Sequence, residues 1–254
     1  MYFRQVFNDD TNCASYVLGC KTEGTFAVVD PHADLVGEYV ALAEAQGAAI
    51  AAVFETHVHA DHVSGLPELV ARTGATAYLP AGAGVDFEHR PLADGDVVRL
   101  GNTEVRAIAT PGHATAHHAY VVADHSRSDE PWLVLTGDAL LVGDAGRPDL
   151  HAHGELTAEQ MARALYRSIV ERLLTLPDHV VLYPGHYSGS VCGRGLSSNP
   201  ISTIGFERRH NPALRHDSED AFVAALLQDL PPAPEHQAAI VAANRAGRSR
   251  AEVA

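Results

Sequence analysis

The sequence is almost without lysine, and it has no long apolar run. Lys21 is the only lysine among 254 residues, and the formal net charge is −14. Nucleic-acid binding depends on clustered Lys and Arg side chains, so this charge argues against a nucleic-acid partner. The apolar runs are only strand-length, which argues against a membrane-spanning helix. The sequence therefore predicts a globular protein with neither a nucleic-acid nor a membrane partner.

Cysteine is also scarce. Cys13, Cys20 and Cys192 are odd in number, and their spacing matches neither a zinc ribbon nor a disulfide framework. The first residues lack the basic region, long apolar stretch and small-residue cleavage site of a secretory signal. We therefore expect reduced thiols and a cytoplasmic protein. The length favours one domain, residues 1–243, followed by a flexible C-terminal tail, residues 244–254.

Strand and helix patterns alternate along the chain. Short β-branched and aromatic runs predict strands, for example SYVLGC, TFAVVD, AAIAAVFET, TEVRAIAT, WLVLTGD and HVVLYPGH. Helical spacing of apolar residues predicts helices in DLVGEYVALAEAQ, GLPELVARTG and TAEQMARALYRSIVERLLTL, and helical pieces near Ile201–Arg209 and Glu219–Gln228. This order predicts an α/β fold with two sheets and the helices outside them.

Metal-binding side chains gather directly after apolar strands. The stretch ETHVHADHVSG, which follows one such strand, contains His57, His59, Asp61 and His62. Further apolar strands lead to His113, Asp138 and His186, each near a glycine that allows close backbone approach. Imidazole nitrogens and carboxylate oxygens bind divalent metals, and loops at strand ends can bring them together. The sequence therefore predicts a metal site at one edge of the sheets.

These positions resemble those of the metallo-β-lactamase superfamily. Thr56 to His62 match its Thr-His-x-His-x-Asp-His motif, and its later ligand positions match His113, Asp138 and His186. The resemblance extends from about Val6 to His186. It implies an αββα sandwich, in which two mixed sheets lie between outer helices and the metal lies at one edge of both sheets. Outside the motif positions, His117 is interpreted as structural and His151 as a loop residue.

Two groups within the superfamily use these positions differently. Glyoxalase II-type thiolester hydrolases use all seven residues to hold two metals, such as zinc. Persulfide dioxygenases hold one Fe(II) per chain with three residues, which would be His57, His113 and Asp138. The flanking sequence resembles the dioxygenases, because Pro148-Asp149-Leu150 follows Arg147 where glyoxalase II has aromatic residues, and a Tyr-Ser-Gly stretch follows His186. A metal-binding or oxygen-sensing module is a non-enzymatic alternative.

The resemblance to persulfide dioxygenases implies a reaction and its participants. A low-molecular-weight thiol persulfide would be oxidised with O2 to sulfite and free thiol, and the carrier could be glutathione, coenzyme A or another thiol. The remaining motif residues would orient ligands and water, and Tyr187 would hydrogen-bond to bound oxygen or sulfur; these catalytic candidates are His59, Asp61, His62, His186 and Tyr187. A separate rhodanese is a possible partner, and we expect a homo-oligomer.

Three residues are predicted to bind the substrate: Arg147, Cys192 and Arg194. Both arginines lie in glycine-rich loops after motif residues, where they could bind an anionic carrier; a buried salt bridge to Asp149 is the alternative for Arg147. Cys192 lies in the loop SGSVCGRG, whereas Cys13 and Cys20 lie in apolar strands and are interpreted as packed, inert thiols. Exposed arginines at 208 and 209 are the next candidates for an anion site.

Overall fold

Two six-stranded sheets form the centre of the molecule in a computed structural model that describes residues 1–151, 156–187, 196–228, 230, 232–233 and 236–253. In order across the first sheet lie β1 (Tyr2–Asn8), β2 (Cys13–Cys20), β3 (Thr25–Val29), β4 (Ala49–Phe54), β5 (Thr76–Pro80) and β6 (Arg90–Leu92). Across the second lie β14 (Ser202–Thr203), β13 (Val181–Pro184), β10 (Leu133–Gly137), β9 (His118–Asp124), β8 (Thr103–Ala109) and β7 (Val97–Leu100). A short pair, β11 (Leu140–Leu141) and β12 (Asp144–Ala145), forms a separate two-stranded sheet next to the second.

Both sheets are mixed, as the sequence predicted. In the first, β1, β2 and β3 pair antiparallel, and β3 to β6 pair parallel. A hairpin joins β2 to β3 between Cys20 and Thr25, and its Gly24 has φ +60°, which glycine adopts without steric cost. In the second sheet only β10 and β13 pair parallel.

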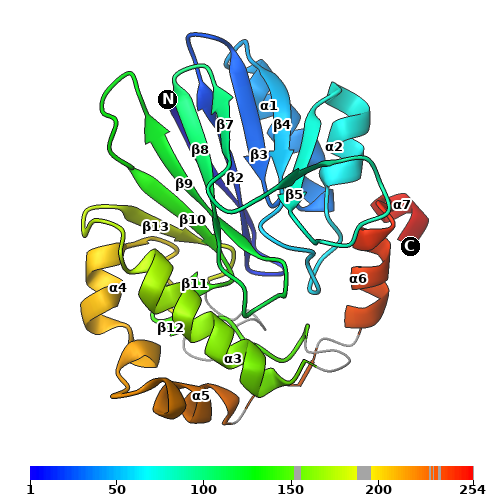
Figure 1. The fold of residues 1–254 in the computed structure, drawn as a ribbon. Helices are drawn as coiled ribbons and strands as arrows, with labels where there is room; N and C mark the ends of the chain where they lie inside the picture. Colours follow the sequence, from blue (N-terminus) through cyan, green and yellow to red (C-terminus); the bar gives the residue numbers. More distant parts are fainter. Residues whose placement is uncertain (152–155, 188–195, 229, 231, 234–235, 254) are drawn as a thin grey trace.

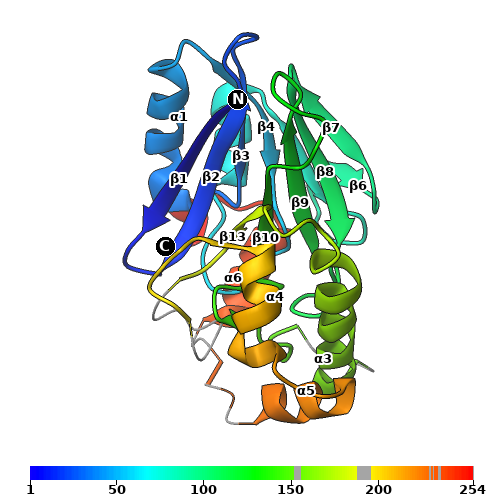
Figure 2. The ribbon, with the colours of Figure 1, turned by 90° about the vertical axis from the view of Figure 1, so that its left-hand side faces the viewer.

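Helices cover the outer face of each sheet (Figures 1 and 2). On the first sheet lie α1 (Val36–Glu44), which follows a 3₁₀ turn at Ala33–Leu35, and α2 (Leu66–Thr73). On the second lie α3 (Ala158–Arg167) with its π-helical continuation Ser168–Leu173, α4 (Ile204–His210), a 3₁₀ turn at Pro212–Leu214, and α5 (Glu219–Leu227). The chain then returns to the first sheet as α6 (Gln237–Arg245) and α7 (Arg250–Val253).

Three apolar layers hold this arrangement together. Strand β2 is buried along its whole length, and its side chains alternate between two layers: Tyr16 and Leu18 face the second sheet, whereas Val17 faces the helices. Full burial on both faces removes the polar alternation expected of a half-exposed strand. The outer layers hold Tyr39 of α1 and Leu165 of α3. The αββα sandwich is therefore confirmed.

Local signals at the helix ends also agree with the structure. Thr157 accepts a hydrogen bond from the backbone N of Gln160, whose side chain in turn accepts one from the backbone N of Thr157, and this capping box starts α3. Gly74 ends α2 in a left-handed conformation with φ +70°. Among the described residues, none of the helices is both long enough and apolar enough to cross a bilayer.

The C-terminal segment contains two helices, α6 and α7. The predicted boundary after residue 243 falls inside α6, and Asn244 is buried. Asn244 contacts the loop after β4. The local sequence around Asn244 contains no motif that predicts this contact. The flexibility expected of the residues beyond α6 stays a prediction.

Candidate metal centre

The predicted metal-binding residues come together at one edge of the two sheets. His57, His59, Asp61 and His62 follow β4, His113 follows β8, Asp138 follows β10 and His186 follows β13. All seven side chains are buried or nearly so, although each comes from a loop. Buried histidines and carboxylates need partners or a cation, so their contacts decide what this edge can do.

Hydrogen bonds fix the protonation of the His57 ring. The Thr56 hydroxyl donates its only proton to Asp30 Oδ2, at a distance of 2.9 Å. Its oxygen also lies 2.9 Å from His57 Nδ1, and in this second hydrogen bond it can only be the acceptor. His57 therefore carries its proton on Nδ1, and Nε2 presents a lone pair. Burial holds the pKa of His57 well below its usual range, which keeps the ring neutral.

His113 is fixed in the same tautomer by a different partner. Its Nδ1 lies 2.9 Å from the carbonyl oxygen of Arg147, which can only accept, so this nitrogen carries the proton. Its Nε2 is then a free base that lies 3.5 Å from Asp138 Oδ2, and His57 Nε2 lies 3.9 Å from the same oxygen. Burial also lowers the pKa of His113. Two lone pairs and a carboxylate oxygen thus face one point.

This convergence fits a metal ion. His57 Nε2 and Asp138 Oδ2 are buried and have no hydrogen-bond partner among the residues that the structure describes. Burial opposes ionisation of Asp138, but the adjacent His186 outweighs it and lowers the pKa of this carboxyl, which stays charged. Unprotonated nitrogens beside a carboxylate repel one another unless a cation lies between them. A divalent ion would supply that cation.

Two glycines leave the space around Asp138 open. A Cβ on Gly146 would overlap the Asp138 carbonyl oxygen and lie 3.2 Å from His113 Nδ1. A Cβ on Gly185 would lie 2.7 Å from Asp138 Oδ1. Neither position can carry a side chain without moving the carboxylate or its backbone. Gly146, in the stretch GDAGRPDL (residues 143–150), therefore allows this loop to pass close to Asp138 and His113.

His59 points away from these three residues. Its Nε2 lies 2.9 Å from Glu55 Oε2 and 3.2 Å from Asp30 Oδ1. Burial lowers the pKa of His59, but the carboxylates of Asp30 and Glu55 outweigh it, and the net shift is strongly upward. Asp30 therefore supports both His57, through Thr56, and His59. It was not among the predicted site residues, although it directly follows the apolar strand TFAVV, the same signal that indicates the ligands.

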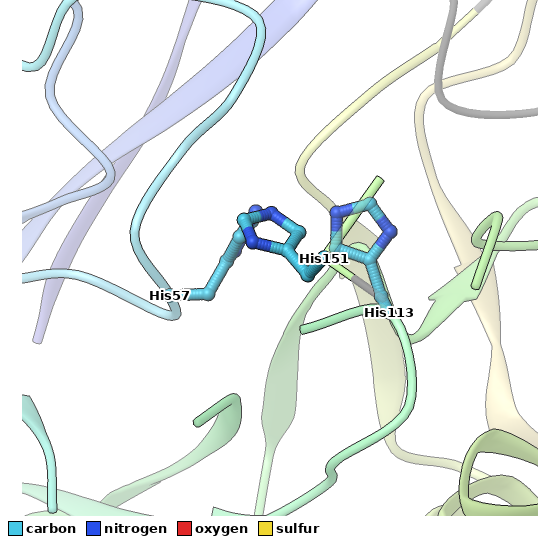
Figure 3. A group of neighbouring side chains, drawn as sticks. All are labelled: His57, His113 and His151. Carbon is cyan, nitrogen blue, oxygen red and sulfur yellow. The ribbon is translucent and has the colours of Figure 1, made fainter. Parts of the chain in front are cut away.

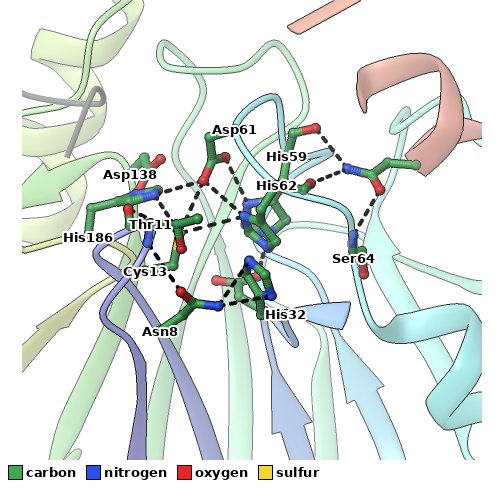
Figure 4. A network of polar contacts seen from close by, with 12 residues as sticks. Asn8, Thr11, Cys13, His32, His59, Asp61, His62, Ser64, Asp138 and His186 are labelled. Atoms are coloured by element: carbon green, nitrogen blue, oxygen red, sulfur yellow. Dashed lines mark hydrogen bonds and ion pairs between the residues drawn. The ribbon is translucent and has the colours of Figure 1, made fainter. Parts of the chain in front are cut away.

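A second cluster, drawn in Figure 4, meets the first at Asp138. His186 bridges two carboxylates: its Nδ1 lies 2.7 Å from Asp138 Oδ1, and its Nε2 lies 2.9 Å from Asp61 Oδ2. His62 Nδ1 also lies 2.9 Å from Asp61 Oδ2. Cys13, predicted to be a packed and inert thiol, places Sγ 3.3 Å from the same oxygen. A cysteine at the start of an apolar strand gave no sign of this position.

Two further histidines belong to the site. Asp138 N donates to His117 Nε2 at 3.2 Å, so His117 holds the backbone of Asp138 in place, in agreement with its predicted structural role. Figure 3 shows His151 close to His57 and His113, and one ring nitrogen of each lies within 4.8 Å of the others. The sequence indicated only a loop position for His151; its burial beside the metal-facing histidines could not be predicted from spacing.

Asn244 of α6 clamps the metal-binding loop from the opposite end of the chain. Its Nδ2 donates to the carbonyl oxygens of His59 at 3.0 Å and His62 at 2.9 Å, and its Oδ1 accepts from Ser64 N at 2.9 Å. The side chain is 8% exposed. Three buried hydrogen bonds to one loop fix its curvature, so α6 helps to position the metal-binding residues.

Replacing Asn244 with alanine should loosen this loop. Two carbonyls and one amide lose their buried partner, so we expect the free energy of unfolding to fall by about 1–3 kcal/mol and metal affinity to fall by roughly 10–100-fold. Arg245→Ala, one residue further on and exposed, is the control and should change neither. Chemical denaturation and competition with a metal chelator measure the two effects. Unchanged metal affinity in Asn244→Ala would show that the clamp serves stability alone.

The predicted substrate-binding residues have mixed placements. Arg147 is buried, and its guanidinium forms two hydrogen bonds of 2.8 Å to Asp149, the salt bridge predicted as its alternative role. Tyr187 donates to Asp9 at 2.7 Å. Arg208 and Arg209 both bind Asp178. Cys192 and Arg194 lie outside the described residues. Substrate binding by any of them stays a prediction.

Comparison with known proteins agrees with this geometry. The sequence profile of the metallo-beta-lactamase superfamily matches residues 8–186, which is more than half of the chain. The chain belongs to this superfamily. It is 29% identical over 96% of its length to the mitochondrial persulfide dioxygenase ETHE1 of Homo sapiens, 88% of which is covered. It is also 32% identical over 91% of its length to a hydroxyacylglutathione hydrolase of Cereibacter sphaeroides, 82% of which is covered.

Solved structures of this superfamily give the same result. ETHE1 from Myxococcus xanthus matches with a TM-score of 0.83 and 32% identity, over 97% of this chain and 99% of that one. A metallo-beta-lactamase from Staphylococcus aureus matches with a TM-score of 0.89 and 30% identity, over 97% of this chain and 72% of that one. Together with the metal-binding geometry, these superfamily relatives indicate an enzyme.

Proposed function

We propose that the protein is a persulfide dioxygenase that uses one Fe(II) per chain. The observation that carries the proposal is the arrangement of His57 Nε2, His113 Nε2 and Asp138 Oδ2 around one point. Two histidines and one carboxylate with open positions are typical of mononuclear Fe(II) oxygenases. Both relatives named ETHE1 support this assignment. Bound Fe(II) would supply the oxygen and electron-transfer chemistry that amino-acid side chains lack.

The proposed reaction balances with water as a co-reactant. One persulfide R-S-SH, one O2 and one H2O give the thiol R-SH, sulfite and two protons. The terminal sulfur is oxidised and O2 is reduced, so no further electron donor is needed. The protons released can pass to water or to buried bases near the centre.

The chain's own residues would prepare the site for this chemistry. Asp30 and Thr56 hold the His57 ring with its lone pair inward. The carbonyl of Arg147 does the same for His113. His186 holds the second oxygen of Asp138, so the carboxylate presents one oxygen to the metal. Such partners fix ligand orientation before a metal or substrate arrives.

The alternative is a thiolester hydrolase with two metals. It is supported by the hydroxyacylglutathione hydrolase relative and by the presence of all seven ligand positions at one edge. The contacts favour the dioxygenase, because His62 Nδ1 and His186 Nε2 both lie within hydrogen-bond distance of Asp61 Oδ2 and so occupy the oxygen that a second ion would need.

Several finer predictions accompany the proposal. The persulfide carrier, glutathione or coenzyme A or another small thiol, would need positive charge near the centre. Arg147 could supply this charge only by breaking its two hydrogen bonds to Asp149. Arg194 remains a candidate for binding the anionic carrier. The supply of persulfide by a separate rhodanese, the homo-oligomeric state and the cytoplasmic location also belong to this proposal.

Oxygen consumption with a persulfide substrate tests the reaction type. Iron-loaded protein should consume O2 and release sulfite in about equal amounts, because the proposed reaction uses one O2 for each sulfite. It should hydrolyse lactoylglutathione negligibly without oxygen. An oxygen electrode and sulfite analysis, with glutathione and coenzyme A persulfides as substrates, measure this. His57→Ala treated in the same way is the control for uncatalysed oxidation. Rapid anaerobic thiolester cleavage would assign the protein to the hydrolases instead.

A further inference from the structure

Cys13 occupies the place where the second cluster of metal-type side chains converges. It is the first residue of β2 and is 3% exposed. Its Sγ lies 3.3 Å from Asp61 Oδ2, 3.3 Å from His186 Nε2 and 3.8 Å from His62 Nδ1 (Figure 4). Asp61, His62 and His186 are residues of types that could otherwise share an ion. The sulfur therefore fills the space between them.

The main chain holds the thiol in this position. Cys13 and His186 form an isolated antiparallel bridge between the two sheets. On either side of it, Ala14 N donates to the Gly185 carbonyl at 2.8 Å, and Tyr187 N donates to the Asn12 carbonyl at 3.2 Å. The main chain thus fixes Cys13 beside His186, where the two sheets meet.

The contacts of the Cys13 sulfur are those of a thiol that donates a hydrogen bond. In addition to Asp61 Oδ2, Sγ lies 3.7 Å from the carbonyl oxygen of Thr11, an atom that can only accept. Asp61 Oδ2 already has His62 and His186 at 2.9 Å. With Cys13 it has three neighbours that can donate to it, which leaves this oxygen no free direction toward an ion.

The Asp138 oxygen that faces the second cluster also has a hydrogen-bond partner. Its Oδ1 lies 2.7 Å from His186 Nδ1, so only Oδ2 faces the metal centre. Asp138 therefore has one oxygen, not two, left for binding ions. Yet other ligand atoms remain nearby: His59 Nδ1 and His62 Nε2 are buried with no hydrogen-bond partner among the described residues, and His59 Nδ1 lies 3.9 Å from Asp61 Oδ1.

We propose that Cys13 keeps the centre mononuclear: its thiol fills the position of a second ion and ties Asp61 and His186 into hydrogen bonds. This inference rests on the proposed function, since it explains why a chain with all seven ligand positions would bind one metal. Without the thiol, Asp61, His62 and His186 could turn toward a second ion and give a two-metal centre suited to hydrolysis. Cys13 would then determine the reaction type through metal number.

Metal counting on Cys13→Ala tests the proposal. Apo-protein is loaded with excess Zn(II), desalted and analysed for ions per chain by mass spectrometry. The wild type should hold about one ion and Cys13→Ala about two, the number in a dinuclear hydrolytic centre. Cys20→Ala is the matched control, because Cys20 is equally buried at the other end of the same strand and lies far from the centre. It should hold about one ion, as the wild type does.

Other results would overturn the proposal. If folded Cys13→Ala still holds about one ion, the thiol does not exclude the second metal. If the wild type holds about two and Cys13→Ala about one, Cys13 is a ligand. Spectroscopy of the Co(II)-loaded wild type tests the latter even if the variant does not fold: we expect no sulfur-to-cobalt charge-transfer band, and such a band would contradict the proposal.

These tests are independent of persulfide oxidation. If wild-type protein oxidises persulfide but Cys13→Ala remains mononuclear, the role of Cys13 is wrong and the proposed function stands. If the zinc counts are as expected but iron-loaded wild type consumes no O2 with persulfide, the proposed function is wrong and the role of Cys13 stands.

Discussion

Alanine at His57, His113 or Asp138 should abolish metal loading. These three residues bring two imidazole lone pairs to a carboxylate oxygen that has no hydrogen-bond partner within the described part of the chain. A mononuclear site that loses one of three protein ligands loses most of its affinity. Iron per chain, measured on freshly purified protein, should therefore fall from about one to near zero in each variant.

Two other histidine variants serve as controls. His59→Ala and His186→Ala remove rings that contact carboxylates rather than the proposed metal position, so both should retain most of the iron. Their activity should fall by about 10–100-fold, as expected for residues that orient ligands. Two metals per active wild-type chain, or equal metal loss in all five variants, would refute the mononuclear assignment.

Gly146→Ala should lower the iron content nearly as much, although Gly146 is not a metal ligand. The new methyl group would overlap the Asp138 carbonyl oxygen, and both Gly146 and Asp138 are buried, so neither backbone can move away freely. Overpacking of this kind costs about 1–3 kcal/mol, and more where the backbone must shift. We expect a lower melting temperature and the loss of most bound iron, because Asp138 would be displaced relative to His113.

The matched substitution is Gly37→Ala. Gly37 is exposed in α1, and a Cβ there meets no atom within 4 Å. Alanine should stabilise this helix by up to about 1 kcal/mol, and iron content should not change. Thermal unfolding and metal analysis of the two variants separate a general effect of the added methyl group from the local clash. Normal iron content in Gly146→Ala would show that the loop can rearrange without cost to the centre.

Much of this fold and site follows from local sequence. The strands are short, apolar and bounded by glycine or proline, and the helices carry their own start and stop signals, so element order predicts the sandwich. The ligand residues could be predicted because each follows a strand within a few residues, for example Asp138 after WLVLTG and His113 three positions after TEVRAIAT. Strand ends that meet at one edge bring such residues together whatever the intervening sequence.

Contacts between distant segments could not be predicted in this way. Cys13 meets His186 across 173 residues, and Asn244 meets His59 across 185. Nothing in the neighbourhood of either residue indicates its partner, since an apolar strand start and a helix end are ordinary places for cysteine and asparagine. The position of His151 depends in the same way on a loop path that no local signal encodes.

The clamp between α6 and the loop after β4 has a consequence for how the protein is made. Most of the ligand residues leave the ribosome long before Asn244, but the loop that carries His57 gains its last three backbone partners only when α6 docks. Closing so long a segment is late in folding, because its loop-closure entropy is repaid only when the final contacts form. Firm metal capture should therefore await the release of α6 from the ribosome. Unfinished or proteolytically shortened chains that lack α6 would have a folded sandwich that retains iron poorly.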